Sequence, residues 1–252
     1  MQTGDRSKVV LVNSPTGGAG ASTICGHLGL AIARMQQFVL LIEVADEQIP
    51  HPLFANPAQL QPQACPYRKT VMHHAPEQLS TNLWRWTVPA HSLVEDAVDF
   101  SANGEPNTWV IVDPGHTGTA LSSGLKEQMG SELLSLQAIA ADTSHISKLT
   151  RASVEELGRV LLTRLDPRRA LSKDIDRVLC TALGDSLLAR LHHDEFLAEG
   201  LAMGTNVFDY ASESLAASQL HSLAREIVES ADDAWTTLKR QDASLAGGLA
   251  NV

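Results

Sequence analysis

The chain has 252 residues, of which 44% are hydrophobic and 4% aromatic, so we expect a sizeable core built mainly from aliphatic side chains. A formal net charge of −10 argues against a general nucleic-acid-binding surface. The cysteines Cys25, Cys65 and Cys180 are too far apart for a disulfide framework, so reduced thiols in the cytoplasm are expected. The sequence shows no signal peptide and no apolar run approaching about 18 residues, so we expect no membrane-spanning helix.

The first structural signal is a continuous β-branched run over Lys8–Asn13, which is typical of a strand buried on both faces. Apolar residues at helical spacing then predict an amphipathic helix over about 21–36. A second apolar run over Phe38–Val44 predicts another strand. Strand, helix and strand within about 35 residues predict a parallel pair joined by a right-handed crossover.

The stretch from 50 to 108 is predicted to be an irregular insert within the domain. Its prolines argue against long regular elements before about residue 90, and they stand at positions 50, 52, 57, 62, 66, 76 and 89. Trp84 and Trp86 lie in a segment, LWRWTV, that predicts one short strand.

Regular elements return after the insert. Strands are predicted over 109–113, 133–141, 159–165 and 187–191, and helices over 144–157, 171–183 and 215–229. Their alternation predicts an α/β fold, with a single doubly wound, mostly parallel sheet flanked by helices. We expect one domain over 1–240 and a flexible tail over 241–252.

A candidate phosphate-binding loop follows the first strand and opens the first helix, and it reads Gly17-Gly18-Ala19-Gly20-Ala21-Ser22-Thr23. Glycines let the backbone curl so that successive N–H groups point inward, and the helix N-terminus adds partial positive charge. The hydroxyl of Ser22 stands where P-loop proteins place a Mg²⁺ ligand. The segment is therefore a candidate site for phosphates and magnesium.

Two other interpretations of this loop remain open. Gly18 and Gly20 supply the first half of the dinucleotide fingerprint G-x-G-x-x-G, and Glu43 lies near the distance of a ribose-binding acid, but Thr23 occupies the place of the third glycine. The segment is also compatible with a glycine-rich strand-to-helix turn that binds nothing.

The loop resembles the P-loop variant of MinD/ParA-type ATPases, whose pattern is Lys-Gly-Gly-x-Gly-Lys-(Thr/Ser)-Thr. Five of the eight positions match, and Thr16 and Ala21 stand where both lysines belong. The strand end Val112-Asp113-Pro114-Gly115 resembles the Walker B and switch II segment of that class, where the Asp orients Mg²⁺ through water. The resemblance implies ATP and Mg²⁺ as ligands, with Ser22 and Asp113 at the metal.

Catalytic groups of that class are missing here. Losing a charge-assisted hydrogen bond from a loop lysine costs about 1.5–3 kcal/mol, so nucleotide contacts are expected to be weaker. MinD-like enzymes carry Asp-x-Asp at the end of the second strand, where this chain reads Glu43-Val44-Ala45, and Asp46 comes one place late. We therefore expect ATP hydrolysis to be slow or absent.

The C-terminal half resembles the BcsQ (YhjQ) family of MinD-like proteins from bacterial cellulose-biosynthesis operons. The matching segments are 165–175, 183–188, 192–202, 207–210 and 214–217. That family's loop also lacks the second lysine, and the similarity covers about 8–48 and 109–230. It implies a nucleotide-binding homodimer that is an accessory or regulatory factor of cellulose synthesis and secretion. It also implies a cytoplasmic location, with recruitment to other secretion components at the inner membrane. The acidic net charge argues against a nucleic-acid partner, and the Ala/Gly/Ser-rich tail is not a basic amphipathic helix, so we expect no membrane anchor there.

By position, the resemblance implies that the adenosine pocket uses two loops, one with Asp166, Pro167 and Arg168 and the other with His193 and Asp194. MinD-like proteins usually have an Asn near the first loop, where Thr163 stands here. Alternative functions are a pseudo-NTPase scaffold that dimerises without nucleotide and a nicotinamide-dependent enzyme. DNA partitioning of the ParA kind is disfavoured by the missing lysines and the acidic charge.

Overall fold

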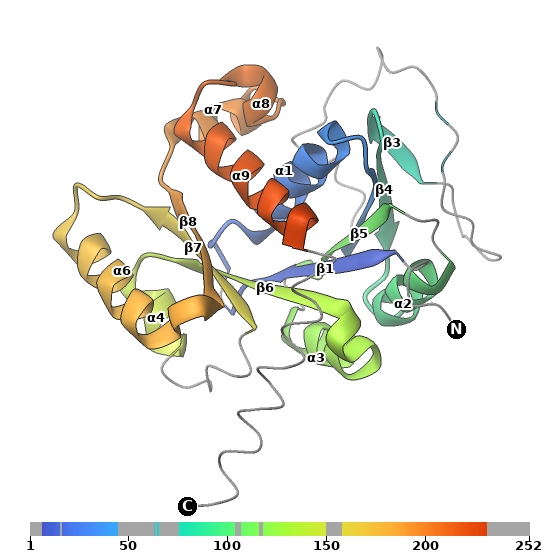
Figure 1. Cartoon of the computed structure of the whole chain (residues 1–252), viewed down its shortest axis with the longest axis horizontal. Coiled ribbons are helices and arrows are strands. Elements are labelled where there is room, and N and C mark those ends of the chain that lie inside the picture. The colour runs from blue at the N-terminus through green and yellow to red at the C-terminus, as the bar shows by residue number, and fades with distance from the viewer. Residues whose placement is uncertain are drawn as a thin grey trace, which may run out of the picture.

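The computed structural model describes residues 7–15, 17–44, 63, 65, 76–103, 107–115, 118–149 and 158–230. Eight strands form one sheet in the order β3-β4-β2-β5-β1-β6-β7-β8 (Figure 1). Every neighbouring pair is parallel except β3–β4. The strands are β1 (Lys8–Asn13), β2 (Phe38–Val44), β3 (Glu77–Ser80), β4 (Leu83–Val88), β5 (Thr108–Asp113), β6 (Leu133–Ala140), β7 (Arg159–Leu165) and β8 (Leu187–His192).

Helices cover both faces of this sheet (Figure 1). One face carries α1 (Ala21–Arg34) and α9 (Leu215–Ser230), which pack against each other. The other face carries α2 (Leu93–Asn103), α3 (Gly118–Met129), α4 (Thr143–Leu149) and α6 (Ala170–Leu183). Two short helices, α7 (Glu195–Ala202) and α8 (Val207–Tyr210), connect β8 to α9. The predicted doubly wound, mostly parallel α/β fold is confirmed.

The central position of β1 follows from its apolar residues. Val10 and Val12 join the core beneath α1 and α9, whereas Val9 and Leu11 join the core beneath α2 and α3. All four side chains are fully buried. A strand that is apolar on both faces is stable only where helices cover both sides of it, so β1 lies between β5 and β6.

The expectation of an irregular insert over the whole of 50–108 was wrong for 77–103. The structure places β3, the predicted strand at 83–88 (β4), and α2 in this part. The upstream prolines gave no sign of this helix, although Leu93, Ala97 and Phe100 recur at helical spacing and are all buried. Phe100 meets Trp86 edge to face, with the ring centroids 5.0 Å apart, so α2 closes the core over β4.

Three predicted boundaries reach residues outside the described ranges. The predicted helix over 144–157 appears as α4 up to Leu149, and 150–157 are not described. The limits 1–240 and 241–252 of the expected domain and tail stay predictions, since description ends at 230.

A buried histidine joins α1 to α8. His27 is fully buried, its Nδ1 donates to the carbonyl oxygen of Thr23 at 2.8 Å, and its Nε2 accepts from the backbone N–H of Val207 at 3.1 Å. The second bond requires an unprotonated Nε2, so the ring is neutral. Burial lowers the pKa of His27 to about 4, although its bond to Thr23 opposes the shift.

This geometry predicts that stability falls on acidification. Between pH 6.5 and about 4 the unfolded chain protonates His27 while the folded chain does not, so the unfolded state binds more protons. The free energy of unfolding should therefore decrease as the pH is lowered through this window, by up to about 3 kcal/mol from this residue. Urea unfolding at several pH values measures the slope.

The variant His27→Gln is the comparison protein. It should be less stable at pH 7.5 by about 1–3 kcal/mol because a buried hydrogen-bond partner is lost, and its unfolding free energy should depend less on pH. Other titrating groups are common to both proteins and cancel in the difference. Equal pH slopes for the two proteins would contradict the assignment.

Candidate functional site

The candidate phosphate loop joins β1 to α1 at the carboxyl edge of the sheet. Gly18 and Gly20 have φ angles of +89° and +85°, a left-handed conformation that favours glycine. A Cβ atom added at Gly17, Gly18 or Gly20 would meet no atom within 4 Å, so the space over the loop is open. Gly18 and Gly20 are therefore required by backbone conformation and not by crowding, and the loop leaves room for a ligand.

The end of β7 anchors this loop. The hydroxyl of Thr163 donates to the carbonyl oxygen of Ala19 at 2.9 Å, and a guanidinium N–H of Arg164 donates to the carbonyl oxygen of Gly18 at 3.2 Å. Thr163 is buried, so the residue at the expected base-reading position instead holds the loop to the sheet. Thr16, at the place of the first missing lysine, lies outside the described residues.

Two carboxylates lie together on the other side of the loop. Asp113 ends β5, is buried, and its Oδ1 accepts from the N–H of Gly115 at 3.0 Å. Glu43 is its register partner on the neighbouring strand β2. Since β1 pairs with β5, Asp113 and the exposed Ser22 at the start of α1 share one edge. A hydroxyl and buried carboxylate oxygens are ligands that suit Mg²⁺, so the donor set fits this ion.

Burial shifts the acid–base properties of this acidic side. Burial raises the pKa of Glu43 to about 7. The guanidinium of Arg85, whose Nε lies 3.9 Å from Oε2 of Glu43, opposes this rise, and the charge of Asp113 adds to it. The pKa of the nearby Cys25 thiol is also raised, mainly by burial and to a smaller extent by the charges of Asp113 and Glu43. The thiol therefore stays protonated. A bound divalent cation would favour the ionised form of Glu43. The positions Ala45 and Asp46 lie outside the described residues.

On the β7 side of the loop, opposite the two carboxylates, a cavity of about 280 Å³ reaches from the phosphate loop toward α7 and α9. Its walls are partly apolar, with Ile24, Leu191, Leu197, Leu201 and Leu220. Gln219 lies on this wall and is fixed by His192, whose backbone N–H donates to Oε1 at 2.9 Å. An apolar cleft with a few fixed polar groups suits a flat ring such as a nucleobase.

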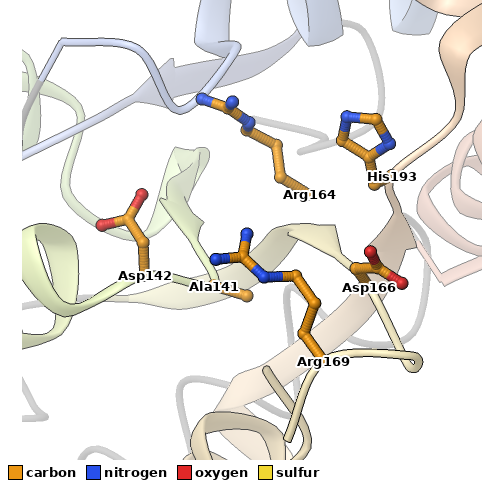
Figure 2. Close-up of a pocket in the computed structure, with 6 residues that line it drawn as sticks. All are labelled: Ala141, Asp142, Arg164, Asp166, Arg169 and His193. Atoms are coloured by element: carbon orange, nitrogen blue, oxygen red, sulfur yellow. The ribbon is translucent and has the colours of Figure 1, made fainter. Parts of the chain in front are cut away.

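A smaller cavity of about 150 Å³ adjoins the first at the ends of β6, β7 and β8. It is lined by Ala141, Asp142, Arg164, Asp166, Arg169 and His193 (Figure 2). The side chains of Arg164 and Arg169 extend in the same direction, toward the side of Asp142 (Figure 2). Arg164 and His193 line both cavities. Sequence reasoning missed Arg164, because nothing in a strand pattern directs it toward the loop, and it assigned Arg168 to the site where Arg169 lines the cavity.

The predicted binding residues separate into three groups. Those lining the larger cavity are Gly18, Ala19, Gly20, Thr23, His193 and Asp194. Asp166 lines the smaller cavity together with His193. Neither cavity is lined by Gly17, Ala21, Ser22, Asp113, Pro167 or Arg168.

Two of the predicted carboxylates already have protein partners. Both oxygens of Asp166 face the guanidinium of Arg168, at 2.9 and 3.2 Å, and the pKa of Asp166 is lowered to about 2 by these bonds. Asp194 caps α7 by accepting from the N–H of Phe196 at 3.0 Å, and it also accepts from the N–H of Ala216 at 2.9 Å. Asp194 thus joins the starts of α7 and α9, a structural role that the sequence did not reveal.

The family model described as "Cellulose biosynthesis protein BcsQ" matches residues 71–228, which is more than half of the chain. The match begins at residue 71, inside the 50–108 stretch, which lies outside the segments that resemble this family in sequence. No curated protein sequence matches the chain.

Solved structures share the fold. The ParA family ATPase from Chlorobium tepidum TLS is 16% identical, with a TM-score of 0.64, over 87% of this chain and 98% of that one. The MinD cell division protein from Aquifex aeolicus is 13% identical, with a TM-score of 0.65, over 88% and 97%. MinD from Pyrococcus horikoshii OT3, complexed with Mg-ADP, is 18% identical, with a TM-score of 0.58, over 88% and 96%. The MinD/ParA-like fold class is therefore confirmed.

The bonds of Asp194 predict a stability effect. Replacing it by Ala removes the acceptor for two backbone N–H groups, so the free energy of unfolding should fall by about 1–3 kcal/mol. Chemical denaturation measures the loss, and the exposed Asp185→Ala variant is the matched control, with an expected change below about 0.5 kcal/mol. Equal stability of the two variants would show that Asp194 is not a cap.

Proposed function

The chain belongs to the cellulose biosynthesis protein BcsQ family, and from this premise we propose that it is a nucleotide-binding accessory or regulatory factor of bacterial cellulose synthesis and secretion. Its ligand is ATP with Mg²⁺. The bound state helps to assemble or localise the membrane synthase complex. The observation that carries this proposal is the open glycine loop between β1 and α1, whose amides lie at a helix N-terminus beside the buried Asp113.

Each part of the nucleotide has a matching part of the site. Residues Gly17–Thr23 hold the phosphates through backbone N–H groups, and Ser22 holds Mg²⁺ while Asp113 acts through water. The loops at 166–168 and 193–194 flank the nucleoside, whose base enters the larger cavity. The similar fold of a MinD protein in complex with Mg-ADP supports this arrangement.

Hydrolysis is proposed to be slow or absent. The second acid of the Asp-x-Asp pattern is Ala45, which has no group to orient an attacking water. The remaining acid, Glu43, holds the first position of that pattern, so it does not replace the missing group at the second. In this proposal the bound nucleotide defines one conformational state of the protein. A partner protein ends that state, either by triggering ATP hydrolysis or without hydrolysis.

Two copies are proposed to face each other across the bound ATP, as the resemblance to MinD/ParA proteins implies. In this proposal one domain spans 1–240, and the tail 241–252 lies outside it. No helix in the described ranges has the length and apolar character needed to cross a membrane. Recruitment to the inner membrane is assigned, in this proposal, to other components of the secretion system.

A scaffold that works without nucleotide is the second candidate. Ala21 stands in the loop where a lysine is expected, and hydrogen bonds from β7 hold the loop carbonyls of Gly18 and Ala19 without any ligand. In that case the dimer forms whether or not ATP is present.

Calorimetry with millimolar ATP and Mg²⁺ tests the proposal. The protein should bind ATP, and turnover should stay below about 1 per minute, far under usual ATPase rates. Ser22→Ala should weaken binding about tenfold in the presence of Mg²⁺ and little in its absence, because the hydroxyl acts through the metal. The control is Thr181→Ala on α6, whose hydroxyl donates to a carbonyl of its own helix.

Mass measurement with and without ATP distinguishes the two candidates. A dimer that requires ATP supports the nucleotide-dependent factor. A dimer of equal strength without ATP, together with no calorimetric signal, would support the scaffold.

A further inference from the structure

The loop lacks lysines, yet a cation does reach it from another strand. Arg164 belongs to β7 and donates a guanidinium N–H to the carbonyl oxygen of Gly18 at 3.2 Å. This loop is the one whose backbone amides form the candidate phosphate site. The side chain is therefore held at the rim of that site.

An unusual backbone conformation brings Arg164 there. Successive side chains of a regular strand point to opposite faces, so Thr163 and Arg164 would not both meet the same loop. Arg164 has a φ of +55°, the left-handed region that a non-glycine residue seldom adopts, and the β7–β8 register shifts between Leu162 and Leu165. Because of this bulge, the side chains of Thr163 and Arg164 both point to the phosphate loop and hydrogen-bond its carbonyl groups.

The charge of Arg164 is available to a ligand. In the described part of the chain neither Arg164 nor Arg169 lies within 4.0 Å of a carboxylate oxygen. The two carboxylates of the smaller cavity are engaged elsewhere, Asp166 by Arg168 and Asp142 by His145 at 2.8 Å. Arginine has five N–H donors, of which the bond to Gly18 uses one.

The position of Arg164 also connects the two cavities. It lines the larger cavity beside the phosphate loop and the smaller cavity beside Arg169 and His193 (Figure 2). A nucleoside in the larger cavity, with its phosphates on the loop, would pass its phosphate chain beside this guanidinium. Planar guanidinium groups bind phosphate oxygens in pairs, whereas a lysine offers a point charge.

We propose that Arg164 is the phosphate-binding cation of this chain, supplied by β7 in place of the missing loop lysines, with Arg169 beside it as a second cation. This inference rests on the proposed function, because it assumes a nucleoside di- or triphosphate on the loop. Arg164 contacts the phosphates themselves, so it discriminates phosphorylated nucleosides from the bare nucleoside.

Nucleotide titrations of Arg164→Gln test this role. Binding of ATP with Mg²⁺ should weaken about ten- to a hundredfold, the loss expected for a charge-assisted hydrogen bond, and adenosine binding should be unchanged. The ATP affinity of the variant should also depend less on salt concentration, because one charge contact is lost. Arg159→Gln is the matched control, since it removes the same charge at the opposite end of β7 and should leave ATP affinity within about twofold.

A rescue variant separates charge from positioning. Ala21→Lys in the Arg164→Gln background puts a cation back at the loop and should restore most of the ATP affinity. The Arg164→Gln variant must also show a cooperative unfolding transition like that of the parent protein. If it does not fold, Arg164→Lys, which keeps the charge, is compared with Arg164→Ala. The lysine variant should then have the higher ATP affinity.

Three results would overturn the inference. Unchanged ATP affinity in Arg164→Gln, or in Arg164→Ala if that variant is used, means that the phosphates do not contact this arginine. Equal losses for ATP and adenosine, with no rescue by Ala21→Lys, mean that Arg164 only holds the loop in place. If the parent protein binds no ATP, the proposed function itself fails and this inference falls with it, whereas the first two results leave the proposed function standing.

Discussion

The burial of β1 on both faces is the constraint on which the site depends. Because Val9 and Leu11 face one core and Val10 and Val12 the other, β1 lies in the middle of the sheet. In the sheet, β5 and β2 lie on one side of β1, and β6, β7 and β8 lie on its other side. The chain therefore changes direction across the sheet at β1. Ligands of open α/β sheets bind at such a switch point, beyond the carboxyl ends of the strands. The loop after β1 therefore opens into a crevice whose two sides come from different strands.

Those two sides carry opposite chemistry. The side of β2 and β5 contributes the carboxyl groups of Glu43 and Asp113, and the side of β7 contributes the guanidinium of Arg164, while Asp142 and Asp166 on that side are paired with His145 and Arg168. A metal–polyphosphate complex carries cation and anion in one ligand, so it suits a crevice divided in this way. The electrostatic pattern supports nucleotide with magnesium more specifically than the glycine loop does alone.

Sequence periodicity was sufficient for the parallel strands and for the helices α1, α6 and α9. Lys8–Asn13, Phe38–Val44 and Arg159–Leu165 have the predicted bounds because buried parallel strands are continuous apolar runs. It failed for α2, since the many prolines upstream outweighed the spacing of Leu93, Ala97 and Phe100. It also could not place Arg164, because strand alternation assumes regular dihedral angles, and the left-handed residue at that position breaks the alternation. The caps made by Asp194 were hidden for a different reason, since Ala216 is 22 residues away in the chain.

A cation that comes from β7 differs physically from a lysine of the loop. A lysine at the start of α1 depends only on the first turn of that helix. Arg164 depends on the bulge between β7 and β8, where Leu165 accepts a hydrogen bond from the N–H of His193 at 2.9 Å and Asp194 then begins α7. The strength of phosphate binding is thereby tied to the packing of this sheet edge. A ligand or partner that changes the packing of β8 and α7 has a short structural route to the phosphate loop, which a loop lysine would not provide.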